Sequence, residues 1–193
     1  FAEDTEVLVE VKKRFEDYLK KHPLNPDIRS PVFSITAANG DEKIYKNLLD
    51  LYSRTESPDE KRMILIALGQ FKDANLLDKV LEFSLSKKVR TQDLAIIMSS
   101  IASNPYSRTV LLSWFKKNWK KIEAYQKSGQ IFIRLLEAVI GSCVSRDSMH
   151  ELKKFFAQHP VKYKMTLNRS FERVERNIRW FEKNKDILAN YFS

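Results

Sequence analysis

The sequence has 193 residues, which is enough for one large domain or for an array of small repeating units. Hydrophobic residues make up 43% of it, which excludes an intrinsically disordered protein. Its 34 lysines and arginines exceed its 25 acidic residues and give a formal net charge of +9, which favours anionic partners such as nucleic acid, acidic proteins or peptide carboxylates.

The first half of the chain has the apolar spacing of amphipathic helices. We predict helices ahead of His22-Pro23, over residues 27–38 and over residues 44–52, with a break at Asn39-Gly40. With only four glycines and six prolines in the whole chain, there are too few turns for an all-β protein.

The stretch SPDEKRMILIALG has the residues that start a helix. Ser57 is the predicted N-cap, Pro58 fits the first helical position, and Glu60 follows the serine by three residues as in a capping box. Asp73 or Asn75 is predicted to open the next helix.

The stretch VRTQDLAIIMSSIASNP predicts an apolar helix with polar residues at both ends. Thr91 is the predicted cap at its start, Asp93 lies in the first turn near the positive end of the helix dipole, and Arg90 is placed to pair with Asp93. At the other end, Asn104 is predicted to cap the following helix and Pro105 to begin it.

The helix after Pro105 is predicted to be basic and aromatic. Trp114 and Trp119 lie five positions apart and do not share one helix face, so we expect one in the core and the other at an interface or groove. Four lysines fall close together on this segment: Lys116, Lys117, Lys120 and Lys121.

Three more helices are predicted, over residues 131–140, 145–158 and 165–191. On the last one, apolar residues gather on one face and four arginines on the other: Arg169, Arg173, Arg176 and Arg179. These arginines either face an anionic ligand or form a solvated face. The second interpretation is favoured because Glu172–Arg176 and Glu175–Arg179 have the spacing of ion pairs within a helix.

The whole pattern predicts an all-α fold. Roughly ten helices in pairs, at a spacing of roughly 30–40 residues per pair, are typical of helical repeat arrays. We therefore expect a HEAT- or armadillo-like α-α superhelix of paired antiparallel helices.

Residues with catalytic or metal-binding spacing are not found. His150-Glu151 begins like the zinc-peptidase motif H-E-x-x-H, but Lys154 stands where the second histidine is needed, so we expect no metal site and no catalytic residue. Cys143 is the only cysteine and is expected in the core. Without a disulfide, a reducing compartment such as the cytoplasm is predicted. No apolar run is long enough to span a bilayer, and no membrane partner is expected.

Several motifs together resemble the C-terminal domain of a zinc aminopeptidase family, which includes puromycin-sensitive aminopeptidase, the endoplasmic-reticulum aminopeptidases and the archaeal tricorn-interacting factors. The family pattern reads S-P-x-E-K, D-x-x-L-L, L-S-x-x-V-R-x-Q-D, N-P-x-G-R and W-x-F-x-x-x-N-W. Matching positions in this sequence are Ser57, Pro58, Glu60, Lys61, Asp73, Leu76, Leu77, Leu85, Ser86, Val89, Arg90, Gln92, Asp93, Asn104, Pro105, Arg108, Asn118 and Trp119. The sequence departs from the pattern at Ser107, Leu112 and Trp114.

The resemblance implies an α-superhelix that closes over a zinc site carried by an earlier catalytic domain. In that case the partners are the catalytic domain of the parent aminopeptidase and a peptide substrate, with zinc in the catalytic domain and none in this chain. We expect a single α-solenoid domain over residues 1–193, from the C-terminal part of a longer enzyme and without the start of that domain. The chain begins FAEDTEVLVEVKKRF without a methionine, which fits a piece of a longer protein.

The resemblance also suggests which residues face the substrate chamber. Arg90, Gln92 and Asp93 are candidates for organising the concave surface or its contact with the catalytic domain, although caps and hydrogen bonds between repeats are the favoured explanation. Lys116 or Lys117 is the candidate cation for a peptide carboxylate, with a solvated basic face as the alternative. Trp119 is a further chamber-facing candidate, whereas Ser57, Asn104 and Pro105 are expected to specify turns.

Two other functions fit an α-solenoid. A stand-alone helical-repeat scaffold that binds a protein would need its own polar capping repeats, and the abrupt start of the sequence argues against it. A solenoid that binds nucleic acid would repeat base-contacting side chains in each unit, and no such repeat is found, so no nucleic-acid partner is expected.

Overall fold

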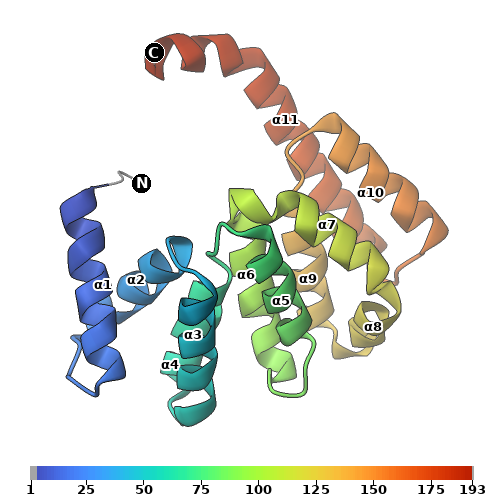
Figure 1. Cartoon of the computed structure of the whole chain (residues 1–193). Helices are drawn as coiled ribbons and strands as arrows, with labels where there is room; N and C mark the ends of the chain where they lie inside the picture. Colours follow the sequence, from blue (N-terminus) through green and yellow to red (C-terminus); the bar gives the residue numbers. More distant parts are fainter. Residues whose placement is uncertain (1–3, 193) are drawn as a thin grey trace. The chain divides into compact units, whose positions relative to one another are not determined.

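The computed structural model describes residues 4–192, and this part of the chain is built from helices with no strand (Figure 1). The all-α prediction is confirmed. The α-helices are α1 (Thr5–Leu19), α2 (Pro26–Ala38), α3 (Glu42–Arg54), α4 (Pro58–Leu68), α5 (Ala74–Ser84), α6 (Leu94–Ser103), α7 (Arg108–Lys117), α8 (Trp119–Glu123), α9 (Gln130–Gly141), α10 (Arg146–Gln158) and α11 (Lys164–Phe192). Short 3-10 helices cover Thr91–Asp93, Pro105–Ser107 and Ala124–Ser128.

The helices gather in two compact units, one ending at Trp114 and the other beginning at Phe115. Each unit has a core of its own in which apolar side chains are fully or almost fully buried. In the first unit these include Phe15, Phe33, Leu48, Leu65, Phe71, Leu77, Leu81 and Ile97, and in the second Phe115, Phe132, Leu136, Val139 and Ile140. The single solenoid domain over residues 1–193 and its superhelical path stay predictions.

Helix starts follow the local sequence closely in the first unit. Ser57 accepts a hydrogen bond from the Glu60 N–H at 3.4 Å, and Asp73 accepts one from the Leu76 N–H at 2.9 Å, so both predicted N-caps are confirmed. Residues predicted as the buried stripe of α6 are also buried, namely Leu94, Ile97, Met98 and Ile101.

The second half of the predicted capping box at Ser57 does not form. The Glu60 carboxylate instead accepts hydrogen bonds from the Thr55 hydroxyl at 2.5 Å and from the Tyr18 hydroxyl of α1. The Ser57 N–H donates to the Thr55 hydroxyl at 3.2 Å. Burial and the neighbouring Glu60 charge raise the pKa of Tyr18 to about 12, so this phenol stays a donor over the physiological range. Glu60, which the sequence predicts to bond within its own helix turn, therefore connects α4 to α1.

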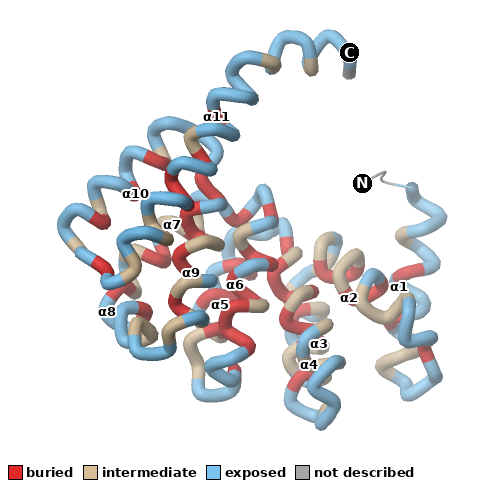
Figure 2. Tube along the Cα trace, turned by 180° about the vertical axis from the view of Figure 1, so that it is seen from behind, coloured by how far each residue is buried: buried red, intermediate tan, exposed pale blue. Residues whose placement is uncertain are grey.

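Only the first part of the last helix, α11, has a buried face. Phe171, Val174 and Ile178 are buried, whereas Phe181 further along the same predicted apolar face is exposed. Figure 2 shows the outer part of α11 in the colours of exposed and half-buried residues. No helix within residues 4–192 is both long and apolar enough to cross a membrane.

Cys143 lies just beyond α9 and is buried, as predicted for a core residue. Burial raises the pKa of its thiol to about 11. The thiolate, which is the reactive form, is then about one part in a thousand at pH 8. We expect Ellman's reagent to modify the native chain at pH 8 far more slowly than the urea-unfolded chain. Equal rates in the two states would contradict this burial.

Candidate functional site

The turn before α6 holds the first group of candidate residues. Arg90 donates from Nε to Asp93 Oδ2 at 2.6 Å, so the predicted pair forms. Asp93 is only 5% exposed, whereas the Arg90 side chain is 46% exposed. The hydrogen bond to Asp93 raises the pKa of Arg90 further above its usual range. The turn therefore presents one cation at the surface, anchored by a buried carboxylate.

Other residues of this turn differ in part from the prediction. Thr91 does not cap a helix with its side chain, because the turn is a 3-10 helix over Thr91–Asp93 and α6 begins at Leu94. Gln92 is exposed and makes no side-chain hydrogen bond to residues 4–192. Beside the turn, the Tyr52 hydroxyl donates to the Lys88 carbonyl at 3.3 Å. The pKa of Tyr52 is raised, mainly by burial and to a smaller extent by the Asp93 charge. Arg90, Thr91 and Gln92 are thus the exposed residues of this turn that a partner could contact.

Asn104 does more than cap the next helix. Its Oδ1 accepts from the Tyr106 N–H at 3.0 Å, which confirms the cap, but what begins at Pro105 is a 3-10 turn before α7. Its Nδ2 donates to the carbonyls of Gly69 at 2.9 Å and Phe71 at 2.7 Å, in the loop between α4 and α5. Asn104 is 3% exposed, so it fastens two neighbouring loops of the first unit from inside the fold.

The departure from the family pattern at Ser107 has a structural explanation. Ser107 is completely buried, and its hydroxyl donates to the Asn104 carbonyl at 2.9 Å and lies against the Ile101 carbonyl. A glycine in its place would leave these carbonyls without this donor. The serine therefore supports the same turn that Asn104 and Pro105 form.

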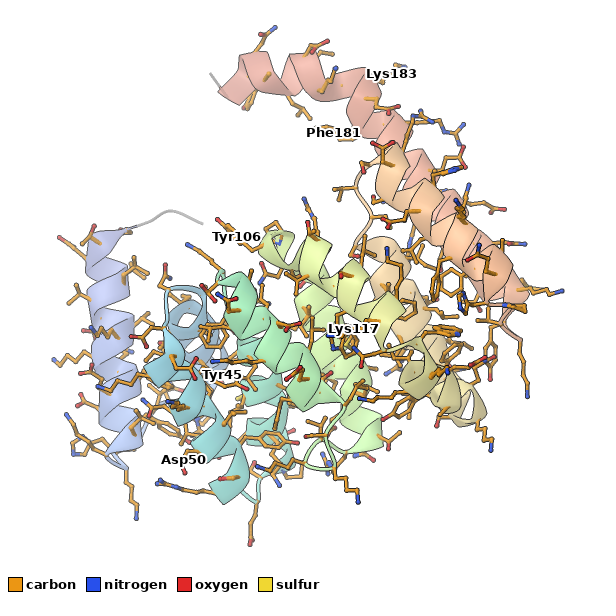
Figure 3. The ribbon with its side chains drawn as sticks, turned by 45° about the vertical axis from the view of Figure 1, so that its right-hand side comes forward. Tyr45, Asp50, Tyr106, Lys117, Phe181 and Lys183 are labelled. Carbon is orange, nitrogen blue, oxygen red and sulfur yellow. The ribbon has the colours of Figure 1, made fainter. Side chains whose placement is uncertain are left out.

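The second group of candidates lines a hollow of about 580 Å³ in the second unit. We call it the lysine hollow. Its lining residues are Lys116, Lys117, Asn118, Trp119, Lys120, Lys121, Glu123, Gln158, His159 and Pro160. All four lysines predicted as a basic group are thus brought together, and Figure 3 labels Lys117 at the end of α7.

The lysines of the hollow differ in their surroundings. Lys116 is half-buried, and its ammonium group forms an ion pair with Glu151 of α10. Lys117, Lys120 and Lys121 are exposed and form no ion pair with a carboxylate of residues 4–192. A bound anion would therefore meet three cations that are not already neutralised, and Lys117 is better available than Lys116.

Trp119 forms the inner wall of this hollow rather than an exposed surface. Its ring lies 5.4 Å from Phe155, 5.5 Å from Phe115 and 5.9 Å from His159, measured between ring centroids. Trp114 and Trp119 are 4% and 5% exposed, so both are buried, and Trp119 is the one that lines a groove. Aromatic neighbours from α7 and α10 surround this ring through edge-to-face contacts.

The loop opposite the lysines was not predicted as part of a site. His159 stacks on Phe155 with ring centroids 4.2 Å apart, and its Nδ1 lies 2.9 Å from the Phe155 carbonyl. In the sequence, His159-Pro160 indicates only the end of a helix. Its place beside α8 depends on how α10 packs, and no local pattern shows that.

Comparison with known proteins now connects these features to a family. The family model of the ERAP1-like C-terminal domain matches residues 1–176. The chain belongs to the ERAP1-like C-terminal domain family. This helical domain is the C-terminal domain of M1 aminopeptidases, so the resemblance seen in the sequence is confirmed.

Individual relatives of this ERAP1-like C-terminal domain are aminopeptidases. The chain is 32% identical over 193 residues to Aminopeptidase M1 of Arabidopsis thaliana, covering 95% of this chain and 22% of the relative. It is 27% identical over 197 residues to the mitochondrial Aminopeptidase 2 of Saccharomyces cerevisiae, covering 98% and 20%, and 25% identical over 179 residues to Aminopeptidase N of Canis lupus familiaris, covering 90% and 18%. The chain thus spans about a fifth of the length of these relatives.

The zinc ion that this family implies does not fit the residues of this domain. Within residues 4–192, no group of three or more His, Cys, Asp and Glu side chains could hold a metal ion. Glu151, which follows His150 in the incomplete zinc-peptidase motif, is paired with Lys116.

Proposed function

We propose that this chain encloses the active-site chamber of a zinc aminopeptidase and controls which peptides reach it. Membership of the ERAP1-like C-terminal domain family supports the aminopeptidase part of the proposal. The catalytic domain of the same enzyme is the proposed partner and carries the zinc, and a peptide is the proposed substrate. A cytoplasmic location is part of the same proposal.

Within this function, the lysine hollow holds the C-terminal carboxylate of a peptide. The observation that supports this role is the group of three exposed lysines without ion pairs around a hollow with an aromatic wall. A carboxylate that enters it gains charge-assisted hydrogen bonds from ammonium groups. The aromatic wall of Trp119 and His159 offers an apolar surface to the last peptide side chain. Arg90 and Gln92, on the first unit, are proposed to contact the catalytic domain.

The enclosing role is tested by reconstitution. The chain alone, with zinc added, is expected to release no product from a fluorogenic leucine or alanine amide. Added to a catalytic fragment of its parent enzyme, it is expected to change the activity or the preferred peptide length. Absence of both binding and any effect on that fragment would overturn the proposal and favour an independent helical scaffold.

The role of the lysine hollow is tested in the intact parent aminopeptidase. Lys117→Gln is expected to raise KM for peptides with a free C-terminus by about twofold to fivefold, which is the effect of an exposed ion pair. It should leave KM for the same peptides with an amidated C-terminus unchanged. Lys127→Gln removes an equal charge outside the hollow and serves as the control. Amidated peptides that bind the unaltered enzyme as tightly as free acids would contradict a carboxylate site.

A further inference from the structure

The exposed side of α11 carries one continuous row of side chains. Arg169, Arg173, Arg176, Trp180, Lys183 and Ile187 follow one another at steps of four, three, four, three and four residues, which keeps them on one side of a helix. We call this row the α11 stripe. At 1.5 Å per residue it is about 27 Å long. None of its members lines the lysine hollow.

The arginines of α11 lack the ion pairs that the sequence predicts for this helix. Glu175 does not pair with Arg179 but with Lys153 of α10, at 3.8 Å. Glu172 and Arg176 form no ion pair. The two ion pairs predicted within the helix are therefore wrong, whereas the arginines are exposed, as the predicted solvated face requires.

A second acidic residue of α11 is also taken by α10. Arg146 binds Glu182 through two hydrogen bonds of 2.8 and 2.6 Å and lowers the pKa of that carboxyl. The pairs with α10 therefore occupy two of the four acidic residues of α11, Glu175 and Glu182. Arg169, Arg173, Arg176 and Arg179 are all exposed, and none forms an ion pair or a side-chain hydrogen bond with a residue that the structure describes.

The outer half of the α11 stripe carries two large apolar residues, one on each side of Lys183. Trp180 is 59% exposed and Ile187 is 68% exposed, beyond the last buried residue of the helix, Ile178. Figure 3 labels Phe181 and Lys183 on this outer part, where their side chains also extend from the helix. Arginine and tryptophan are residues that protein interfaces favour and that dominate their binding energy. One surface thus offers positive charge at one end and a large aromatic ring at the other.

We propose that the α11 stripe docks an acidic amphipathic helix of another protein. Carboxylates placed one per turn on such a helix repeat at the same interval as Arg169, Arg173 and Arg176, and apolar side chains one or two turns further on reach Trp180 and Ile187. A stripe with this many arginines and few apolar residues has the composition of a reversible interface. A permanent contact would be more apolar.

The charge distribution of α11 favours a protein over a polyanion as the occupant. Glu172 and Asp186 flank the α11 stripe, and both are exposed. A nucleic acid or an anionic membrane would bring negative charge against these carboxylates along its whole length. A protein helix can place basic or neutral residues opposite them and acidic residues opposite the arginines.

The test uses the full chain and a designed helical peptide of 18 residues, with glutamates on one face of its first half and leucines on the same face of its second half. Trp114 and Trp119 are buried, so Trp180 is the tryptophan that added quencher reaches. Peptide binding is expected to shift the emission of Trp180 to shorter wavelength and reduce its quenching by acrylamide. Arg173→Gln with Arg176→Gln is expected to weaken binding about fivefold to thirtyfold in low salt, as loss of two surface ion pairs would.

Matched controls separate this surface from general attraction by a basic chain. Lys164→Gln with Lys185→Gln removes the same charge from α11 outside the α11 stripe and is expected to leave binding unchanged. A peptide with the same composition but scrambled faces is expected to bind weakly. Circular dichroism checks that the variants keep their helix content.

Several results would overturn the proposal. These are no binding of the peptide, equal loss in both pairs of variants, or equal binding of the scrambled peptide. Tighter binding of a single-stranded oligonucleotide or of anionic lipid vesicles through Arg173 and Arg176 would assign the surface to a different ligand. Self-association of the chain that disappears in the Arg173→Gln, Arg176→Gln variant would assign it to a second copy.

Discussion

Replacing Trp119 with alanine is expected to lower the free energy of unfolding of the second unit by about 3–5 kcal/mol. The Trp119 ring has aromatic neighbours from three helices, including Phe115 of α7, Phe132 of α9 and Phe156 of α10. Its removal leaves a cavity that these side chains can fill only in part, and it also removes the edge-to-face contacts that aromatic pairs favour. The loss is measured by urea unfolding followed by circular dichroism and by amide exchange in α8, α9 and α10.

Trp180→Ala is the matched control for this experiment. Both substitutions delete an indole, but Trp180 is exposed on α11 and its removal should change stability by less than about 0.5 kcal/mol. Similar losses for the two variants would mean that Trp119 is not part of a packed core. If Trp119→Ala keeps its stability yet changes peptide binding in the parent enzyme, the ring acts as an open contact surface, as the sequence first suggested.

The caps and the apolar stripes could be predicted from the sequence because they depend on residues within one or two turns. Ser57 and Asp73 cap their helices through backbone N–H groups three residues away, and Leu94 to Ile101 are buried because their spacing places them on one face. The pair of Arg90 and Asp93 is equally local. Family motifs at these positions added the domain type to a fold class that spacing alone had indicated.

The choice of partner for a charged residue could not be predicted in the same way. Glu60, Glu175 and Glu182 each have a plausible partner nearby in the sequence, but each one bonds to a residue of a different helix. An exposed pair within a helix contributes only a few tenths of a kcal/mol, so packing decides among several partners of similar strength. Only part of the lysine hollow could be predicted, because the rest of it also depends on packing between helices. Its lysines are local, but His159 reaches them only through the packing of α10.

Replacing Asn104 with alanine is expected to lower the free energy of unfolding of the first unit by about 2–4 kcal/mol. The change removes the cap of the turn at Pro105 and leaves the Gly69 and Phe71 carbonyls without a donor inside the fold. The loop at Gly69 cannot shift easily to find another donor, because its backbone is packed against α6. A Cβ built at Gly69 would lie only 2.5 Å from the Ser100 hydroxyl of that helix. Urea unfolding gives the size of the loss, and Asn75→Ala, at an exposed asparagine of α5, gives the baseline.

Asn104→Asp then separates the cap from the loop contacts. The new side chain keeps an acceptor for the Tyr106 N–H, but its second oxygen replaces a donor and faces the carbonyls of Gly69 and Phe71. An ionised carboxylate there is repelled by both oxygens, so its pKa should rise above that of an ordinary aspartate. The stability of this variant, compared with the unaltered chain, should therefore improve as the pH falls through that raised pKa and the acid becomes a donor. If Asn104→Asp is as stable as the unaltered chain at pH 7, the cap is the only contribution of Asn104, and the link between the two loops contributes nothing measurable.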